Sequence, residues 1–418
     1  MKNIKKISLI LVIIICSALA GSTLAMWYIN RDKVIIPKVY FQGDMSNMLT
    51  KSDERNIKIR YEDQNKEFET YAKIKFQGTS SLAYDKKNYT ITLYEDENYE
   101  SKNKILMKEE WGAQSKYCLK ANWIDKTHSR NIITARIAAT ANEKYGVFAN
   151  TPHNGTIDGF PIEVYLNDEF LGIYTWNIPK DEWLWNLDDE NPNHIVIGAG
   201  NHSDTTRFKA EATDFNEDEW EVEVGQENEE TLDKLNRLIS FVKDSTDEEF
   251  EEDYELYIDK DAMLNYIAIY SVSEAIDNIT KNLMLVTYDG KVWAPCLYDL
   301  DTTFGTDAAG NLLKSYEKYE YDMKVSLLFK RTVETFPTEV ADRYFELRKD
   351  ILTKENIMKE FEEFKYYIPD ETFEKEAERW SDIPGESIEQ ISTFLDYRIP
   401  FIDTYMNELY DIENTTDE

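Results

Sequence analysis

The chain has 418 residues, 42% of them hydrophobic, and a formal net charge of −34 at pH 7. This charge argues against nucleic-acid binding and against docking on an anionic membrane through basic patches. Three cysteines, at positions 16, 118 and 296, exclude a disulfide framework and leave one bridge between Cys118 and Cys296 or two buried thiols. The acids are densest between Asp214 and Asp259, which favours either a basic protein substrate or a solvated surface.

An uncharged apolar run covers residues 7–29 and follows three lysines near the start of the chain. About 20 apolar residues span a bilayer, and lysines before the span keep that end in the cytoplasm. The Ala-Leu-Ala sequence at 18–20 also matches a signal-peptide cleavage site. Residues 1–30 are therefore predicted to be a membrane anchor or a signal peptide, and both interpretations place the rest of the chain outside the cytoplasm.

Alternating apolar and polar residues predict strands at 56–61, 71–76 and 89–94, so the first folded portion is expected to be β-rich. Between the second and third strands, Gly78 permits a tight turn, and hydroxyl side chains and lysines follow it. Backbone N–H groups and an ammonium both favour an anion, so this loop is a candidate phosphate cradle. An ordinary turn of the same composition is the alternative.

A further strand is predicted at 117–121, and Ser129 is expected to cap a helix from 130 to about 145. Arg130 either forms a structural ion pair with Asp125 or reaches a phosphate group. Residues 162–173 predict a hairpin with an Asn-Asp turn.

The pattern becomes helical from about residue 231, and Asp259 is expected to cap a helix that delivers Asp277 to a site. After Gly305, helices are predicted to the end of the chain. Four arginines recur on these acidic helices and are interpreted as internal salt-bridge partners: Arg343, Arg348, Arg379 and Arg398.

The segment 275–305 predicts a hairpin, with a strand at 283–288, an Asp-Gly turn and a return strand from 291. A two-residue turn would place Asn282 opposite Leu297 and Asn278 opposite Asp301. The open end of the hairpin would then gather oxygen-bearing side chains around one cation: Asp277, Asn278, Asn282, Asp299 and Asp301. Oxygen ligands without His or Cys suit Mg²⁺ or Mn²⁺. A hairpin that merely has polar ends is the alternative.

Three motifs together resemble the CotH kinase family, atypical protein kinases first met as spore-coat proteins. They are D-N-x-x-x-N with D-x-D-x-x-F-G at 277–305, F-x-G-T-S-S with two lysines at 76–87, and N-W-I-D-K-T-H-S-R-N at 122–131. The resemblance extends over residues 37–409. It implies an α+β, atypical protein-kinase-like fold of two lobes, β-rich over 31–180 and mostly helical over 181–410. The composition of residues 411–418 predicts an acidic tail.

By the same resemblance, Asp277 occupies the catalytic acidic position. Metal would be held by Asn282 and by the two acids of the D-x-D motif, Asp299 and Asp301, of which the register favours Asp301. The nucleotide phosphates would be contacted by Ser80, Ser81, Lys87 and, in one interpretation, Arg130.

The resemblance implies a kinase that uses ATP and Mg²⁺ (or Mn²⁺) to phosphorylate Ser or Thr of an exported or surface protein. One alternative is an inactive kinase-fold protein with a structural or binding role in the cell envelope or on the spore surface. Another is a metal-dependent hydrolase or a calcium-stabilised adhesin. Zinc hydrolysis is disfavoured, because none of the four histidines forms a ligand-spaced pair.

Overall fold

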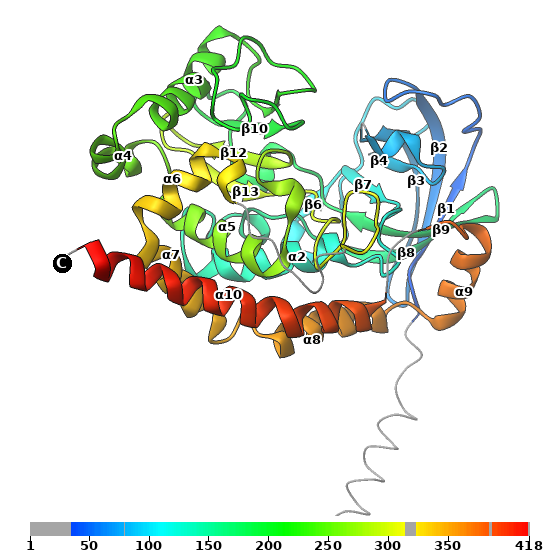
Figure 1. Cartoon of the computed structure of the whole chain (residues 1–418). Coiled ribbons are helices and arrows are strands. Elements are labelled where there is room, and N and C mark those ends of the chain that lie inside the picture. Colours follow the sequence, from blue (N-terminus) through cyan, green and yellow to red (C-terminus); the bar gives the residue numbers. More distant parts are fainter. Residues whose placement is uncertain (1–34, 79, 314–322, 384–386, 417–418) are drawn as a thin grey trace, which may run out of the picture.

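The computed structural model describes residues 35–78, 80–313, 323–383 and 387–416. Strands of the N-terminal region close into a barrel in the order β1-β2-β3-β4-β7-β9-β8 (Figure 1). These strands are β1 (Lys38–Gln42), β2 (Glu54–Glu62), β3 (Glu67–Gln77), β4 (Asn88–Tyr94), β7 (Lys116–Lys120), β8 (Gly159–Leu166) and β9 (Glu169–Asn177). The strands predicted at 56–61, 71–76 and 89–94 lie within β2, β3 and β4. Buried side chains alternate with more exposed ones along these strands, and the buried side chains fill the barrel interior.

The predicted hairpin at 162–173 is formed by β8 and β9. Its turn residues Asn167 and Asp168 have φ angles of 50° and 69°, a left-handed conformation that Asn and Asp tolerate well. A small separate sheet pairs β5 (Ile105–Leu106) with β6 (Ala113–Gln114).

The C-terminal region is mostly helical around a four-stranded sheet in the order β11-β10-β12-β13 (Figure 1). Its strands are β10 (Ile195–Ala199), β11 (Trp220–Val224), β12 (Leu283–Thr287) and β13 (Ala294–Leu297). The helices of this region are α3 (Glu229–Asp244), α4 (Asp247–Asp253), α5 (Lys260–Ser273), α6 (Leu327–Thr335), α7 (Pro337–Arg348), α8 (Lys354–Tyr366), α9 (Asp370–Arg379) and α10 (Ile388–Thr416). The α+β prediction, with a strand-rich N-terminal region and a helical C-terminal region, is confirmed.

Helix α2 (Arg130–Lys144) lies in the chain between two barrel strands but packs against α5 and α8. It begins where predicted, although Ser129 makes no side-chain cap. Asp125 caps the start of the helix instead, because Asp125 Oδ2 accepts hydrogen bonds from the backbone N–H groups of Ser129 and Arg130, both at 2.8 Å. The cap predicted for α5 is confirmed, since Asp259 accepts from the N–H of Ala262.

The hairpin of β12 and β13 forms, but the predicted register is wrong by one residue. Leu283 pairs with Leu297, and Val286 pairs with Ala294. The loop over 288–292 is longer than a two-residue turn, because Asp289 Oδ1 accepts from the N–H groups of residues 291 and 292. The polar residues beyond the hairpin therefore meet through their loops and not as facing pairs.

Cys118 and Cys296 are buried free thiols, so the disulfide alternative is wrong. Among the four arginines, salt bridges join Arg343 to Asp261, Arg348 to Asp403 and Arg398 to Glu274. The guanidinium of Arg379 instead lies 5.2 Å from the ring centroid of Trp380.

No helix in the described residues is both long and apolar enough to cross a bilayer. The predicted anchor or signal peptide at 1–30 lies outside those residues. At the other end of the chain, α10 continues through Thr416, so the segment predicted as an acidic tail begins as part of a helix.

A buried ion pair fastens α9 to the barrel. Lys86 Nζ lies 2.6 Å from Glu376 Oε1, and the two side chains are 0% and 5% exposed. Lys86 also donates to the carbonyl of Ala121, while Glu376 Oε2 accepts from the N–H of Ile173. Gly172 leaves room for the pair, because a Cβ there would lie 2.7 Å from Lys86 Cε. Burial lowers the pKa of Lys86, and the Glu376 carboxylate opposes that effect.

We predict that Glu376→Gln lowers the free energy of unfolding by about 3–5 kcal/mol, because it leaves a buried ammonium without its counter-charge. Glu378→Gln is the matched control, since Glu378 is exposed two residues further along the same helix; it should change stability by less than about 0.5 kcal/mol. Urea denaturation of both variants measures the difference, and equal stabilities would show that the pair does not fasten α9.

Candidate active site

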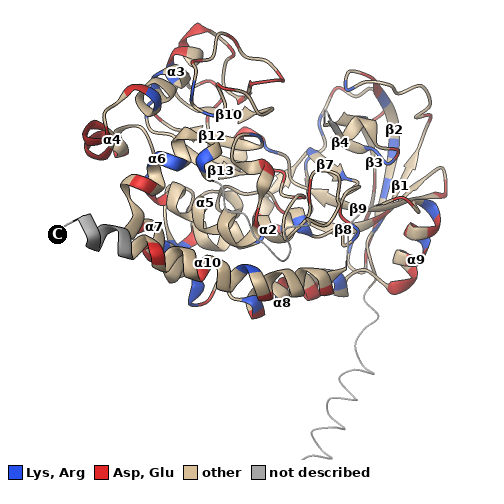
Figure 2. Cartoon of the chain, in the orientation of Figure 1, with Lys and Arg blue, Asp and Glu red and all other residues tan. Residues whose placement is uncertain are grey.

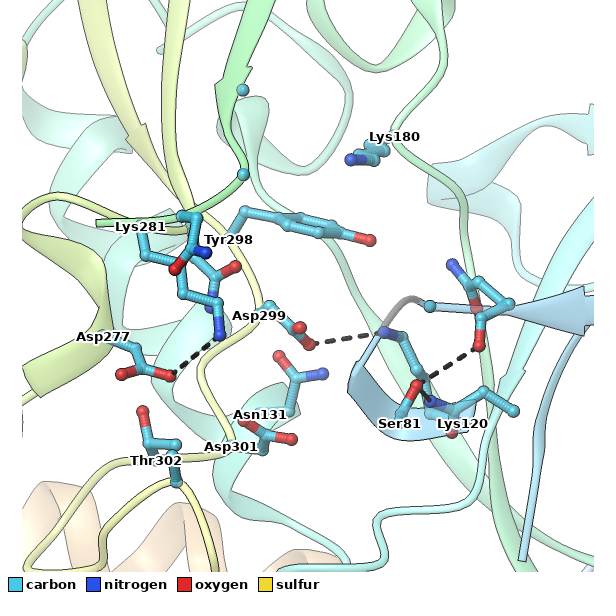
Figure 3. A pocket seen from close by; sticks show the side chains of 18 of the residues that line it. Ser81, Lys120, Asn131, Lys180, Asp277, Lys281, Tyr298, Asp299, Asp301 and Thr302 are labelled. Atoms are coloured by element: carbon cyan, nitrogen blue, oxygen red, sulfur yellow. Dashed lines mark hydrogen bonds and ion pairs between the residues drawn. The ribbon is translucent and has the colours of Figure 1, made fainter. Parts of the chain in front are cut away.

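A cleft of about 550 Å³ lies between the barrel and the four-stranded sheet. The barrel contributes the loop from β3 to β4 and the end of β7. The sheet side contributes the end of β10, the segment before β12 and the segment after β13. Figure 3 shows side chains from both sides pointing into this space.

Three aspartates from the segment 275–305 line the cleft: Asp277, Asp299 and Asp301. Asp277 lies in a short 3-10 turn just after α5, whose C-cap residue Glu274 has a left-handed conformation. Asp299 itself has a φ of 55°, an uncommon value for a non-glycine residue. The N–H of Leu300 donates to Asn131 Oδ1 at 3.0 Å, which fixes the D-x-D segment to the start of α2.

The two D-x-D acids lie in different electrostatic surroundings. Asp299 Oδ1 lies 3.3 Å from Lys120 Nζ, whereas Asp301 has no hydrogen bond or ion pair with a described residue. Burial, and then the negative charge of Asp299, raises the pKa of Asp301 well above its usual value, and the Lys120 ammonium opposes this shift. A divalent cation between the carboxylates would offset their repulsion, so the donor chemistry fits the predicted metal.

Lys120 is a site residue that sequence reasoning missed. It ends β7, its side chain is 11% exposed, and it faces Asp299 across the cleft (Figure 3). Burial disfavours its charge, but the neighbouring groups, with the Asp299 carboxylate first among them, outweigh burial and raise the pKa of Lys120. The signal available in the sequence was a lysine directly after the apolar residues 117–119 of a strand, since lysines are rarely buried without a partner.

The two predicted amide ligands separate in the structure. Asn282 lines the cleft with a φ of 55°, and its N–H donates to the carbonyl of Ala199. Asn278 is fully buried and does not line the cleft; its Nδ2 donates to the carbonyl of Tyr298 at 2.6 Å. The side chain of Asn278 therefore holds the segment after β13 in place. The prediction that it would bind a cation is wrong.

Ser81 is the predicted phosphate residue that lines the cleft. Its Oγ accepts from Asn88 Nδ2 at 3.2 Å, and Gly78, with a φ of 91°, brings the backbone close to it. A Cβ at position 78 would lie 2.1 Å from Ser81 Oγ, so only glycine fits here without rearrangement. Ser80 begins the 3-10 turn Ser80–Ala83, and its side chain lies outside what the structure describes.

Lys87 and Arg130 do not line the cleft. The ammonium of Lys87 donates to the carbonyls of Leu82 and Tyr84 and so braces its own loop. Arg130 is fully buried and forms an ion pair with Asp125, the structural interpretation of the two left open above. Its guanidinium also reaches the carbonyl of Thr303 and the side chain of Gln390, so it joins α2 to the D-x-D segment and to α10.

Two further cleft residues had no signal in the sequence: Tyr298 and Lys180. The ring of Tyr298 lies between two ammonium groups, with its centroid 4.6 Å from Lys180 Nζ and 5.8 Å from Lys120 Nζ. Lys180 is paired in turn with Glu223 of β11. These contacts join segments far apart in the chain, which local patterns do not reveal.

In the part of the chain that the structure describes, no group of three or more His, Cys, Asp or Glu side chains is arranged to hold a metal ion. The predicted ligand set combines two carboxylates with the amide of Asn282. Mg²⁺ in kinase sites is commonly held by one or two carboxylates together with substrate phosphates, so two protein carboxylates suffice for such a site.

The sequence matches the model of one protein family. The model of the family described as CotH kinase protein matches residues 74–402, a span that contains the barrel loop, Lys120 and all three aspartates. No curated protein matched the chain. Because the family model covers well over half of the sequence, the chain belongs to the CotH kinase family.

Proposed function

We propose that this protein transfers the γ-phosphate of ATP to Ser or Thr hydroxyls of a protein outside the cytoplasm. Family membership indicates a CotH-type kinase. The observation that carries the finer proposal is the gathering of Asp277, Asp299, Asp301 and Lys120 in one cleft. Phosphoryl transfer needs little covalent chemistry from the protein, only positioned charges and a carboxylate near the incoming hydroxyl.

Each cleft residue has a separate role in this proposal. Asp299, Asp301 and Asn282 would hold Mg²⁺, which when bound neutralises the oxygens of the β- and γ-phosphates. Lys120 would turn from Asp299 toward the phosphates, and Ser81 would contact them from the barrel side. Asp277 is set apart from the D-x-D pair in Figure 3, where it is available to accept the proton of the acceptor hydroxyl.

The outer wall of the cleft is acidic. It is lined by Glu217, Asp218, Glu221 and Glu223. Acidic residues are also frequent along α4 (Figure 2). Burial, and then the neighbouring Glu223, raises the pKa of Glu221, so a cation beside it would be stabilising. This wall supports a basic protein segment as the acceptor.

An inactive binding protein with the same fold is the competing function. It is favoured by the placement of Lys87 and Arg130, because these two predicted phosphate contacts are used for internal bonds. The two functions differ in one measurable respect: an active kinase transfers phosphate through the aspartates of the cleft, whereas an inactive binding protein transfers none.

We predict that Asp277→Asn and Asp301→Asn each reduce phosphate transfer by at least about 10²-fold, through loss of the proton acceptor and of a metal ligand, respectively. The assay is transfer from labelled ATP to a basic, Ser-rich peptide, with circular dichroism to show that the variants fold. Asp168→Asn is the control, because Asp168 is an exposed turn residue whose left-handed backbone Asn also adopts. Near-wild-type transfer by either cleft variant would refute the assignment.

We also predict that ATP binding requires a divalent cation. Carboxylates outnumber lysines among the residues that line the cleft, so a bare triphosphate is repelled. ATP with Mg²⁺ should raise the melting temperature, whereas ATP with EDTA should leave it unchanged. A shift of equal size in EDTA would contradict the role given to the aspartates.

A further inference from the structure

Lys281 differs from the other lysines of the cleft. Among the lining residues that the structure describes, Lys51, Lys86, Lys120 and Lys180 are each paired at 3.3 Å or less with Glu217, Glu376, Asp299 and Glu223, respectively. Lys281 Nζ lies 3.8 Å from Asp277 Oδ2, which is beyond hydrogen-bond distance. In the described part of the chain, its ammonium makes no hydrogen bond.

The position of Lys281 is fixed by its neighbours in the chain. The N–H of Asn282 donates to the carbonyl of Ala199 at 2.8 Å, and Asn278 is tied to the carbonyl of Tyr298. Tyr266 of α5 donates its hydroxyl hydrogen to the carbonyl of Asn278. The backbone that carries Asp277 and Lys281 is therefore braced from α5, β10 and the end of β13, which keeps the side chain of Lys281 within reach of the cleft.

The positive charges of Lys120 and Lys281 lie on opposite sides of the aspartates of the cleft. Lys120 lies on the barrel side of the D-x-D aspartates, and Lys281 lies on the opposite side beside Asp277 (Figure 3). His202 Nε2 is 3.9 Å from the other oxygen of Asp277, but burial lowers the pKa of His202 and so disfavours its charged form. Lys281 is thus the cation in contact with Asp277 among the described residues.

We propose that Lys281 is a catalytic residue that contacts the phosphoryl group while it moves to the acceptor. This inference rests on the proposed function. In the step, the acceptor oxygen bonds to the γ-phosphorus as its proton passes to Asp277. The bond from the γ-phosphorus to the β–γ bridging oxygen breaks, and its electron pair leaves with ADP. The three equatorial oxygens carry negative charge throughout, and an ammonium on the acceptor side stabilises it.

A residue that contacts the phosphoryl group during transfer affects the reaction differently from a residue that binds the nucleotide. An interaction made only in the transition state raises kcat without tightening ground-state binding. Lys120, on the barrel side, is expected to affect the binding of Mg²⁺ and ADP themselves. Lys281 is expected to leave that binding unchanged and to act only when a group occupies the γ-position.

The test measures ADP affinity by calorimetry with Mg²⁺, in the presence and absence of aluminium fluoride, which occupies the place of the moving phosphoryl group. We expect fluoride to tighten ADP binding by at least about tenfold in the wild-type protein. Lys281→Met should abolish this gain while the affinity for Mg²⁺ and ADP alone changes less than about twofold, and Lys281→Arg should keep part of the gain. Lys291→Met, which removes an exposed lysine from the far end of the same hairpin, should behave as wild type.

Other outcomes overturn the inference in distinguishable ways. If Lys281→Met retains the fluoride gain, or weakens ADP binding equally with and without fluoride, Lys281 does not act on the moving group. If the wild-type protein binds Mg²⁺ and ADP but aluminium fluoride does not raise the affinity for ADP, the role of Lys281 is refuted and the proposed nucleotide binding is supported. If wild type binds no nucleotide at all, the proposed function fails as well.

Discussion

The mutual repulsion of Asp299 and Asp301 is the constraint on which the site depends. Two carboxylates separated by one residue are held in one partly buried cleft, and among the described residues the ammonium of Lys120 pairs with one of them, Asp299. Such an arrangement is costly unless a cation joins it. The fold maintains it through a left-handed backbone at Asp299 and through the bond from Leu300 to Asn131, so the strain lies where the chemistry is proposed.

The rest of the molecule supports that arrangement from a distance. Arg130 joins the D-x-D segment to α2 and α10, and the ion pair of Lys86 and Glu376 fastens α9 to the barrel next to the loop that carries Ser81. Lys86 also lines the cleft. A helix that follows the D-x-D motif by many residues therefore supports the barrel side of the site, and family membership covers this helix as well.

Local patterns in the sequence predicted much of the fold. Strand alternation gave β2, β3 and β4, helical spacing gave the C-terminal helices, and the segment 275–305 brought Asp277, Asp299 and Asp301 to one place. What sequence reasoning missed depends on contacts between distant residues. The register changed because Asp289 closes a longer loop with its own side chain, and Arg130 and Lys86 are internal because their partners lie far along the chain. Lys281 occupied an unassigned position of the D-N-x-x-x-N motif, and Lys120 lay just before the motif at 122–131. Only the folded cleft shows the two lysines beside the aspartates.

The most direct measurement is a crystal structure of this protein with Mg²⁺ and a non-hydrolysable ATP analogue. We predict a metal about 2.1 Å from a carboxylate oxygen of Asp301, in contact with the β- and γ-phosphates, with Lys120 turned toward the phosphates and away from Asp299. A nucleotide bound elsewhere, or phosphates that lie in the cleft with the D-x-D carboxylates turned away from any metal, would contradict it.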